Sequence, residues 1–292
     1  MYKNIVFKGG GVLGIAYVGA LKVLSEKGLL NSVERIAGTS AGAIFATLLT
    51  VGYSPDELDD IMSGLNFKSF EDGNLIGEVE GVLSSRHGLH RGKFFEQWIE
   101  KLIFDKTKVP FSTFKDLHDL SYPTLSTVTT YLNEGDVIIC NYQSTPDVIV
   151  SEAVRASMSI PLFFDRFIFT KGFNSTQAFV DGGEILNYPI SLFNGYPDED
   201  TIGLFLHDIQ NVQPPLIIDS MVDFAKANFE ATLASGNAEF FNNSKYVKQT
   251  ILIDSLGISA TNFGLSDVDK LKLYNSGTDA ANKYFLNKQY IW

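Results

Sequence analysis

Two glycine-rich turns in the first 42 residues constrain the fold most strongly. Residues 9–14 (GGGVLG) follow a short apolar segment at 5–7, and residues 38–42 (GTSAG) follow a segment at 33–37 (VERIA) that we interpret as a short strand. Each turn leads into an apolar stretch long enough for a helix. Two successive strand–turn–helix units predict parallel strands with helices packed against the sheet that they form.

The second turn places a serine in the pattern G-x-S-x-G. A sharp turn from strand to helix holds a serine hydroxyl clear of its neighbours, and the flanking glycines, Gly38 and Gly42, permit the crowded backbone. The same five residues can also form an ordinary helix start capped by serine or threonine. Because the flanks fit a strand at 33–37 and a helix at 43–49, we interpret Ser40 as a candidate nucleophile.

The first turn is suited to binding an anion. Backbone N–H groups at such a loop and helix start carry partial positive charge, which favours the oxyanion that forms during acyl transfer. The candidate donors are Gly9, Gly10, Gly11 and Gly14. The two turns together therefore predict an attacking oxygen beside an anion-binding loop.

A third motif follows the strand predicted at residues 178–180. Asp181 ends this strand, and Gly182 and Gly183 let the backbone turn tightly after it. An aspartate before glycine is also a common turn signature without any chemical role. In a sheet of parallel strands, however, ligands bind at the carboxyl ends of the strands, where we expect both Ser40 and Asp181 to project.

The rest of the chain continues the alternation of strands and helices. Further strands are predicted at 124–132, 137–142, 201–206 and 250–253. Helices are predicted at 15–27, from 93 onward, at 216–234 and at 266–285. This alternation predicts a three-layer α/β sandwich with a central, mostly parallel sheet flanked by helices. No proline-rich or low-complexity linker divides the chain, which favours one domain over residues 1–292.

Composition narrows the classes of function. The formal net charge is −11, so a nucleic-acid partner, which needs a basic surface, is not expected. The N-terminus has no apolar signal segment, and the longest apolar stretch, at 43–51, is too short to span a bilayer. We therefore expect a soluble, cytoplasmic protein that contacts membranes only peripherally.

Taken in order, the three motifs resemble those of the patatin-like phospholipase family. The family has a triple-glycine oxyanion loop, a G-x-S-x-G serine and a later D-G-G or D-G-A aspartate, and residues 155–161 (RASMSIP) also resemble its block between serine and aspartate. The resemblance implies a Ser–Asp dyad without histidine, in which Asp181 accepts the proton of Ser40 and later activates water. It places the oxyanion near the amides of Gly10 and Gly11, and it implies no metal or other cofactor.

The resemblance also implies the class of substrate. We expect hydrolysis of a fatty-acyl ester of a phospholipid or lysophospholipid, with contact to a membrane or lipid aggregate, and we leave the oligomeric state open. Asp181 would need partial burial, because an ordinary aspartate with a pKa near ~3.9 is a poor base. The family loop usually carries arginine or lysine at the position of Leu13, so charge support for a phosphate head group is in question here, whereas the backbone amides are unaffected.

Three alternatives are compatible with parts of the sequence. His207 follows Asp181 in the order Ser, Asp, His of a conventional α/β-hydrolase triad. A lipid-binding module without turnover would keep the motifs but not the activity. The glycines of residues 9–14 also satisfy G-x-G-x-x-G, but the acidic residue expected to bind a ribose is misplaced, because Glu34 precedes the end of its strand.

Overall fold

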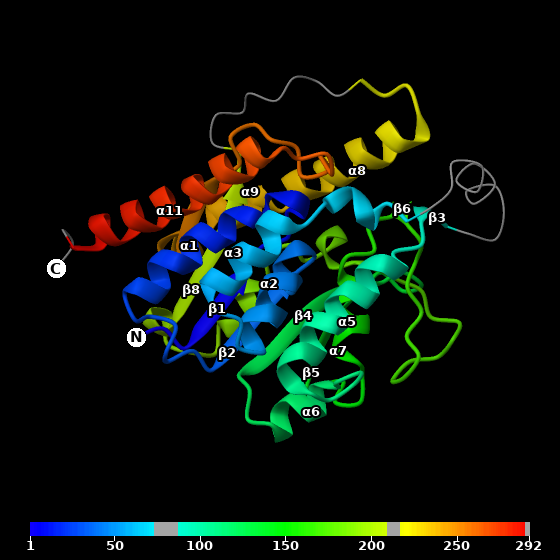
Figure 1. Cartoon of the computed structure of the whole chain (residues 1–292), viewed down its shortest axis with the longest axis horizontal. Helices are drawn as coiled ribbons and strands as arrows, with labels where there is room; N and C mark the ends of the chain where they lie inside the picture. Colours follow the sequence, from blue (N-terminus) through cyan, green and yellow to red (C-terminus); the bar gives the residue numbers. More distant parts are fainter. Residues whose placement is uncertain (73–86, 209–216, 290–292) are drawn as a thin grey trace.

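A central sheet organises the computed structural model, which describes residues 1–72, 87–208 and 217–289 (Figure 1). Within these residues the sheet has seven strands in the order β5-β4-β2-β1-β8-β9, with β7 also paired to β4. The strands are β1 (Asn4–Phe7), β2 (Arg35–Thr39), β4 (Thr124–Tyr131), β5 (Asp136–Asn141), β7 (Phe179–Asp181), β8 (Thr201–His207) and β9 (Thr250–Asp254). Only β5 and β7 run antiparallel to their neighbour, so the predicted mostly parallel sheet is confirmed.

Helices cover both faces of this sheet, as predicted. The longer helices are α1 (Ile15–Glu26), α2 (Ala41–Thr50), α3 (Pro55–Gly64), α5 (Lys93–Thr107), α7 (Val150–Ser157), α8 (Met221–Ser235) and α11 (Asp267–Gln289). Figure 1 shows α1, α2, α3 and α11 together on one side of β1, β2 and β8. None of the described helices combines the length and the apolar character needed to cross a bilayer.

The other face of the sheet carries a thinner layer of short elements. They are the 3₁₀ helix η4 (Pro189–Phe193) and the helices α9 (Asn237–Asn242) and α10 (Ser244–Lys248). Ile190 and Phe193 of η4 pack there against Val6 and Ala37 of the sheet. The remaining elements are α6 (Phe114–Asp119), the strand pair β3 (Gly88–His90) and β6 (Leu162–Phe164), and the 3₁₀ turns η1 (Gly11–Gly14), η2 (Phe67–Phe70), η3 (Gly182–Glu184) and η5 (Asp198–Asp200).

Local sequence explains where several of these elements begin. All four residues of β1 are buried, as expected for a central strand covered on both faces. Helix α3 begins at a capping box in which Ser54 and Glu57 each bond the other's backbone amide. The helix predicted from residue 216 begins at Met221, because the side chain of Ser220 accepts the amide of Asp223 and caps it there.

Strands β2 and β7 meet end to end along one edge of β4. Strand β5 pairs with the other edge, so β2 and β7 must share the remaining one. Thr39 of β2 is opposite Val128, and Asp181 of β7 is opposite the next residue, Thr129. The expectation that Asp181 ends a parallel strand is therefore wrong: β7 runs antiparallel and reaches the carboxyl end of β2 from the opposite direction.

Candidate active site

Ser40 lies at the sharp turn between β2 and α2. Its backbone has φ 54° and ψ −127°, a conformation that costs free energy for any residue other than glycine. Its amide donates to the Ser157 hydroxyl at 2.8 Å, which helps to hold this turn. A Cβ atom at Gly38 would lie 2.2 Å from the carbonyl oxygen of Gly42, and one at Gly42 would lie 2.5 Å from that of Phe7. Both flanking glycines are therefore required by the close backbone packing.

The hydroxyl of Ser40 faces the carboxylate of Asp181, 141 positions further along the chain. Ser40 Oγ donates to Asp181 Oδ2 over 2.6 Å, a typical length for a hydroxyl–carboxylate hydrogen bond. Ser40 Oγ also lies 3.5 Å from the sulfur of Met158. Both Ser40 and Asp181 have 0% exposed surface, so the pair is shielded from bulk water.

Burial tunes the carboxyl group of Asp181. Removal from water raises its pKa from 3.8 to about 7, and the hydrogen bonds from Ser40 and Gly183 oppose this rise. The amide of Gly183 donates to Oδ1 at 2.7 Å, and the amide of Asp181 itself donates to the carbonyl of Ser159 at 2.9 Å. A base with a pKa near neutral pH accepts a proton in the transition state far better than an ordinary aspartate.

The glycine loop leaves two neighbouring amides available. Gly9 donates its amide to the carbonyl of Asn187 at 3.0 Å, and Val12 donates to that of Ala260 at 3.0 Å. Within the described part of the chain, the amides of Gly10 and Gly11 have no hydrogen-bond acceptor. Partly buried donors without partners are costly unless they bind something, and two adjacent ones suit an oxyanion.

Gly9 and Gly14, the other two predicted donors, have packing roles in this loop. A Cβ atom at Gly9 would lie 2.2 Å from Asn187 Oδ1, and one at Gly14 would lie 2.7 Å from the ring of Phe45 in α2. The absent side chains let the loop lie close to its neighbours.

A buried lysine directly precedes the glycine loop, and sequence reasoning missed it. Lys8 Nζ donates to the carbonyl of Leu206 at 3.0 Å and lies 4.5 Å from the centre of the Phe205 ring. Burial lowers its pKa to about 7, although the charge of Glu230 acts in the opposite direction. Leu13, where the resemblance implies a cation, is buried and apolar. The signal in the sequence was a lysine at the end of an otherwise apolar strand.

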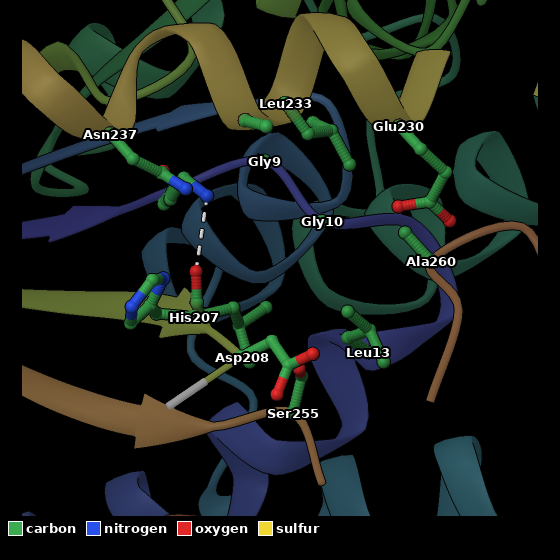
Figure 2. Close-up of a pocket in the computed structure, with 13 residues that line it drawn as sticks. Gly9, Gly10, Leu13, His207, Asp208, Glu230, Leu233, Asn237, Ser255 and Ala260 are labelled. Atoms are coloured by element: carbon green, nitrogen blue, oxygen red, sulfur yellow. Dashed lines mark hydrogen bonds between the residues drawn. The ribbon is translucent and has the colours of Figure 1, made fainter. Parts of the chain in front are cut away.

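A pocket of about 220 Å³ borders the glycine loop on the side of β8 (Figure 2). Figure 2 shows it between Gly9 and Gly10, the end of β8 at His207, and the helix that carries Glu230. Neither Ser40 nor Asp181 lines it. The pocket therefore reaches the anion-binding loop but stops short of the buried pair.

The structure does not bring His207 to Ser40. Strand β1 lies between β8 and β2, and each step across a sheet is about 4.8 Å. Burial and the nearby charge of Lys8 also lower the pKa of His207. Ser40 Oγ instead has Asp181 and Met158 as its contacts, so the alternative triad lacks its central hydrogen bond.

The chain is similar to several known proteins. The family model for patatin-like phospholipases matches residues 5–194. An uncharacterized protein of Bacillus subtilis, YqhO, is 33% identical, with 95% of this chain and 96% of the relative covered. A probable lipid hydrolase of Invertebrate iridescent virus 6 is 24% identical over 99% of this chain and 90% of that protein.

Solved structures support the fold. VipD from Legionella pneumophila superposes with a TM-score of 0.68 at 16% identity, covering 97% of this chain and 66% of VipD. At that level of identity the similarity establishes the architecture alone. Together, the match over residues 5–194 and the nearly full-length relative at 33% identity show that this chain belongs to the patatin-like phospholipase family.

Proposed function

We propose that this protein is a serine-dependent lipid acyl hydrolase of the phospholipase A type, with Ser40 as nucleophile and Asp181 as base. The observation that carries the proposal is the 2.6 Å hydrogen bond between Ser40 Oγ and the buried carboxylate of Asp181. Membership of a family of lipid hydrolases supports the class of reaction, and the unpartnered amides of Gly10 and Gly11 support an oxyanion site.

Acylation of Ser40 follows from this arrangement. Ser40 Oγ attacks the ester carbonyl carbon while its proton passes to Asp181 Oδ2. The carbonyl oxygen becomes negatively charged and binds the amides of Gly10 and Gly11. When the tetrahedral intermediate collapses, the bond to the alcohol breaks, and Asp181 returns the proton to the leaving oxygen.

Deacylation reverses the roles of the two oxygens. Asp181 accepts a proton from water as the water oxygen attacks the acyl-Ser40 ester. Collapse of the second tetrahedral intermediate breaks the bond to Ser40 Oγ, which regains its proton, and the fatty acid leaves. One carboxyl group with a pKa of about 7 can serve both half-reactions, because it gains and loses the same proton near neutral pH.

The surroundings of the pair suit a lipid ester of a phospholipid or lysophospholipid. The pocket beside the loop has both apolar walls, including Leu13 and Leu233, and charged ones. Helix α8 forms part of this pocket, and exposed apolar side chains lie just before it, at Ile217 (76% exposed), and in its first turn, at Phe224 (48%). We expect this start of α8 to contact the lipid aggregate peripherally, so that substrate enters beside the glycine loop.

A panel of labelled glycerolipids tests the proposal. We expect the purified protein to release fatty acid from at least one phospholipid or lysophospholipid, and the Ser40→Ala variant to release none. A lipid-binding module without turnover would bind the lipids and leave them intact in both forms. Undiminished release by Ser40→Ala would instead place the nucleophile elsewhere.

A further inference from the structure

The side chain of Asn187 is buried and polar. The residue is 6% exposed, yet within the described part of the chain neither Oδ1 nor Nδ2 has a hydrogen-bond partner. Its backbone is well held, because the carbonyl of Asn187 accepts the amide of Gly9. Burying a carboxamide without partners costs free energy, so such a group calls for an explanation beyond packing.

The carboxamide oxygen lies near both members of the Ser–Asp pair. A point at the Cβ position of Gly9 is 2.2 Å from Asn187 Oδ1 and 3.0 Å from Ser40 Cβ. The corresponding point at Gly183 is 3.1 Å from Asn187 Oδ1 and 2.9 Å from Asp181 Oδ1. Asn187 therefore occupies the space that two glycines leave open beside the nucleophile and the base.

Water is the reactant that this position suits. An oxyanion needs donors, which the amides of Gly10 and Gly11 offer, whereas an attacking water needs two acceptors for its protons. Asp181 is one acceptor, and Asn187 Oδ1 lies near it, on the other side of the Cβ position of Gly183. A cavity of about 60 Å³, lined in part by Asn187, Lys8 and Tyr188, reaches Asn187 and has room for water.

We propose that Asn187 is a further catalytic residue, whose carboxamide oxygen holds the water that hydrolyses the acyl-Ser40 intermediate. The water donates one proton to Asn187 Oδ1 as a hydrogen bond and gives the other to Asp181. Its oxygen attacks the ester carbon, the bond to Ser40 Oγ breaks, and Ser40 recovers the proton from Asp181. This inference rests on the acyl hydrolase activity proposed above.

The test separates acylation from deacylation in Asn187→Ala. A p-nitrophenyl acyl ester is used, because its leaving group departs without a proton and acylation then needs no help at that oxygen. We expect steady-state turnover to fall on the order of 10- to 100-fold, because the water is no longer positioned. Acyl-Ser40 should accumulate by intact mass, and the rate of labelling by a fluorophosphonate should stay within about twofold of wild type.

Asn4→Ala is the matched control, because Asn4 is a buried asparagine whose side chain is paired. Its Nδ2 donates to Thr201 Oγ1 at 3.0 Å, and its Oδ1 accepts from Arg35 at 3.1 Å. We expect Asn4→Ala to lower the melting temperature by roughly 3–6 °C with unchanged turnover. Asn187→Ala should do the reverse, with a melting temperature within about 2 °C of wild type because no internal hydrogen bond is lost.

The outcomes that overturn the inference are distinct from failure of the proposed function. Unchanged turnover in Asn187→Ala rejects the role, as does a fall in labelling that parallels the fall in turnover without acyl-enzyme. A melting temperature lowered as much as in Asn4→Ala, with normal turnover per folded molecule, makes Asn187 structural. A wild-type protein that neither labels at Ser40 nor turns over ester rejects the acyl hydrolase itself.

Discussion

Residues 155–159 contribute to two buried polar clusters, which differ in how completely their polar groups are hydrogen-bonded. Arg155 is buried and donates to the carbonyls of Gly92 at 3.1 Å, Arg91 at 2.9 Å and Asp165 at 3.3 Å, and to the hydroxyl of Ser159. Ser157 and Met158, by contrast, contact Ser40 of the dyad.

The cluster around Ser40 and Asp181 combines backbone strain, a desolvated carboxyl group and, in the residues that the structure describes, one unpaired polar side chain. The backbone of Ser40 is strained, and burial raises the pKa of the Asp181 carboxyl group. The side chain of Asn187 has no hydrogen-bond partner among the described residues. Complete pairing of buried groups favours stability, whereas preorganised groups without partners favour binding of a reacting molecule. We therefore expect the Arg155 cluster to contribute to stability and, under the proposed function, the Ser40–Asp181 cluster to contribute to catalysis.

Asp181→Asn should break the chemical cluster most severely. Asparagine cannot accept the proton of Ser40, so we expect ester hydrolysis to fall on the order of 10⁴-fold. The free energy of unfolding of this variant should rise, not fall, above neutral pH. The protonated carboxyl stabilises the fold fully below pH 3.8, and this contribution is lost as pH rises through about 7.

In urea unfolding, Asp181→Asn should therefore have the same free energy of unfolding as wild type near pH 4. At pH 8 its free energy of unfolding should be higher than that of wild type by roughly 3 kcal/mol. If the variant and wild type were equally stable at both pH values, Asp181 would not be desolvated, contrary to the structure.

Arg155→Met should damage stability instead. It removes the guanidinium donor from three carbonyl groups and one hydroxyl, so we expect a loss of roughly 3 kcal/mol in the free energy of unfolding. Hydrolysis per folded molecule should change only several-fold, measured after correcting for the folded fraction. A stable variant without activity would give Arg155 a role in catalysis, and the two clusters would then not differ in function.

The pH dependence of kcat/KM tests the proposed role of Asp181 as the base. Only the carboxylate form can accept a proton, so kcat/KM should fall about tenfold per unit below pH 7 and level off above it. Lys8 also has a pKa of about 7, so Lys8→Met serves as the control and should retain the acid limb. Loss of that limb in Lys8→Met would assign it to the lysine.

A smaller effect is expected at the exposed apolar residues just before and in the first turn of α8, where we propose lipid contact. Replacing Ile217 and Phe224 by aspartate should lower activity on phospholipid vesicles roughly tenfold, because both are exposed apolar residues that would enter the interface. Activity on a short soluble ester should stay unchanged, since neither residue contacts the dyad. Equal activity on both substrates in the variant would move the lipid contact elsewhere.

His207→Asn should have the smallest effect. Because β1 separates β8 from β2, we expect less than about a twofold change in hydrolysis of a soluble ester. A loss of activity comparable to that in Asp181→Asn would support the alternative triad of Ser40, Asp181 and His207.

The sequence predicted the fold class and the motifs because each depends on short-range pattern. Ser40 follows from a strand, two glycines and a helix, and Asp181 from a strand end and two more glycines. Their meeting depends on β7 pairing beyond the end of β2, which no local pattern encodes. The pairing states of Lys8 and Asn187 depend equally on distant strands and loops, so neither residue was identified before the structure was known.

Labelling by a fluorophosphonate probe, followed by peptide mapping, tests the Ser40–Asp181 pair most directly. We predict a single adduct on Ser40 in the wild-type protein and a rate of labelling lowered at least about 100-fold in Asp181→Asn, because the hydroxyl then has no base. An adduct on another residue, or an undiminished rate in Asp181→Asn, would contradict the account.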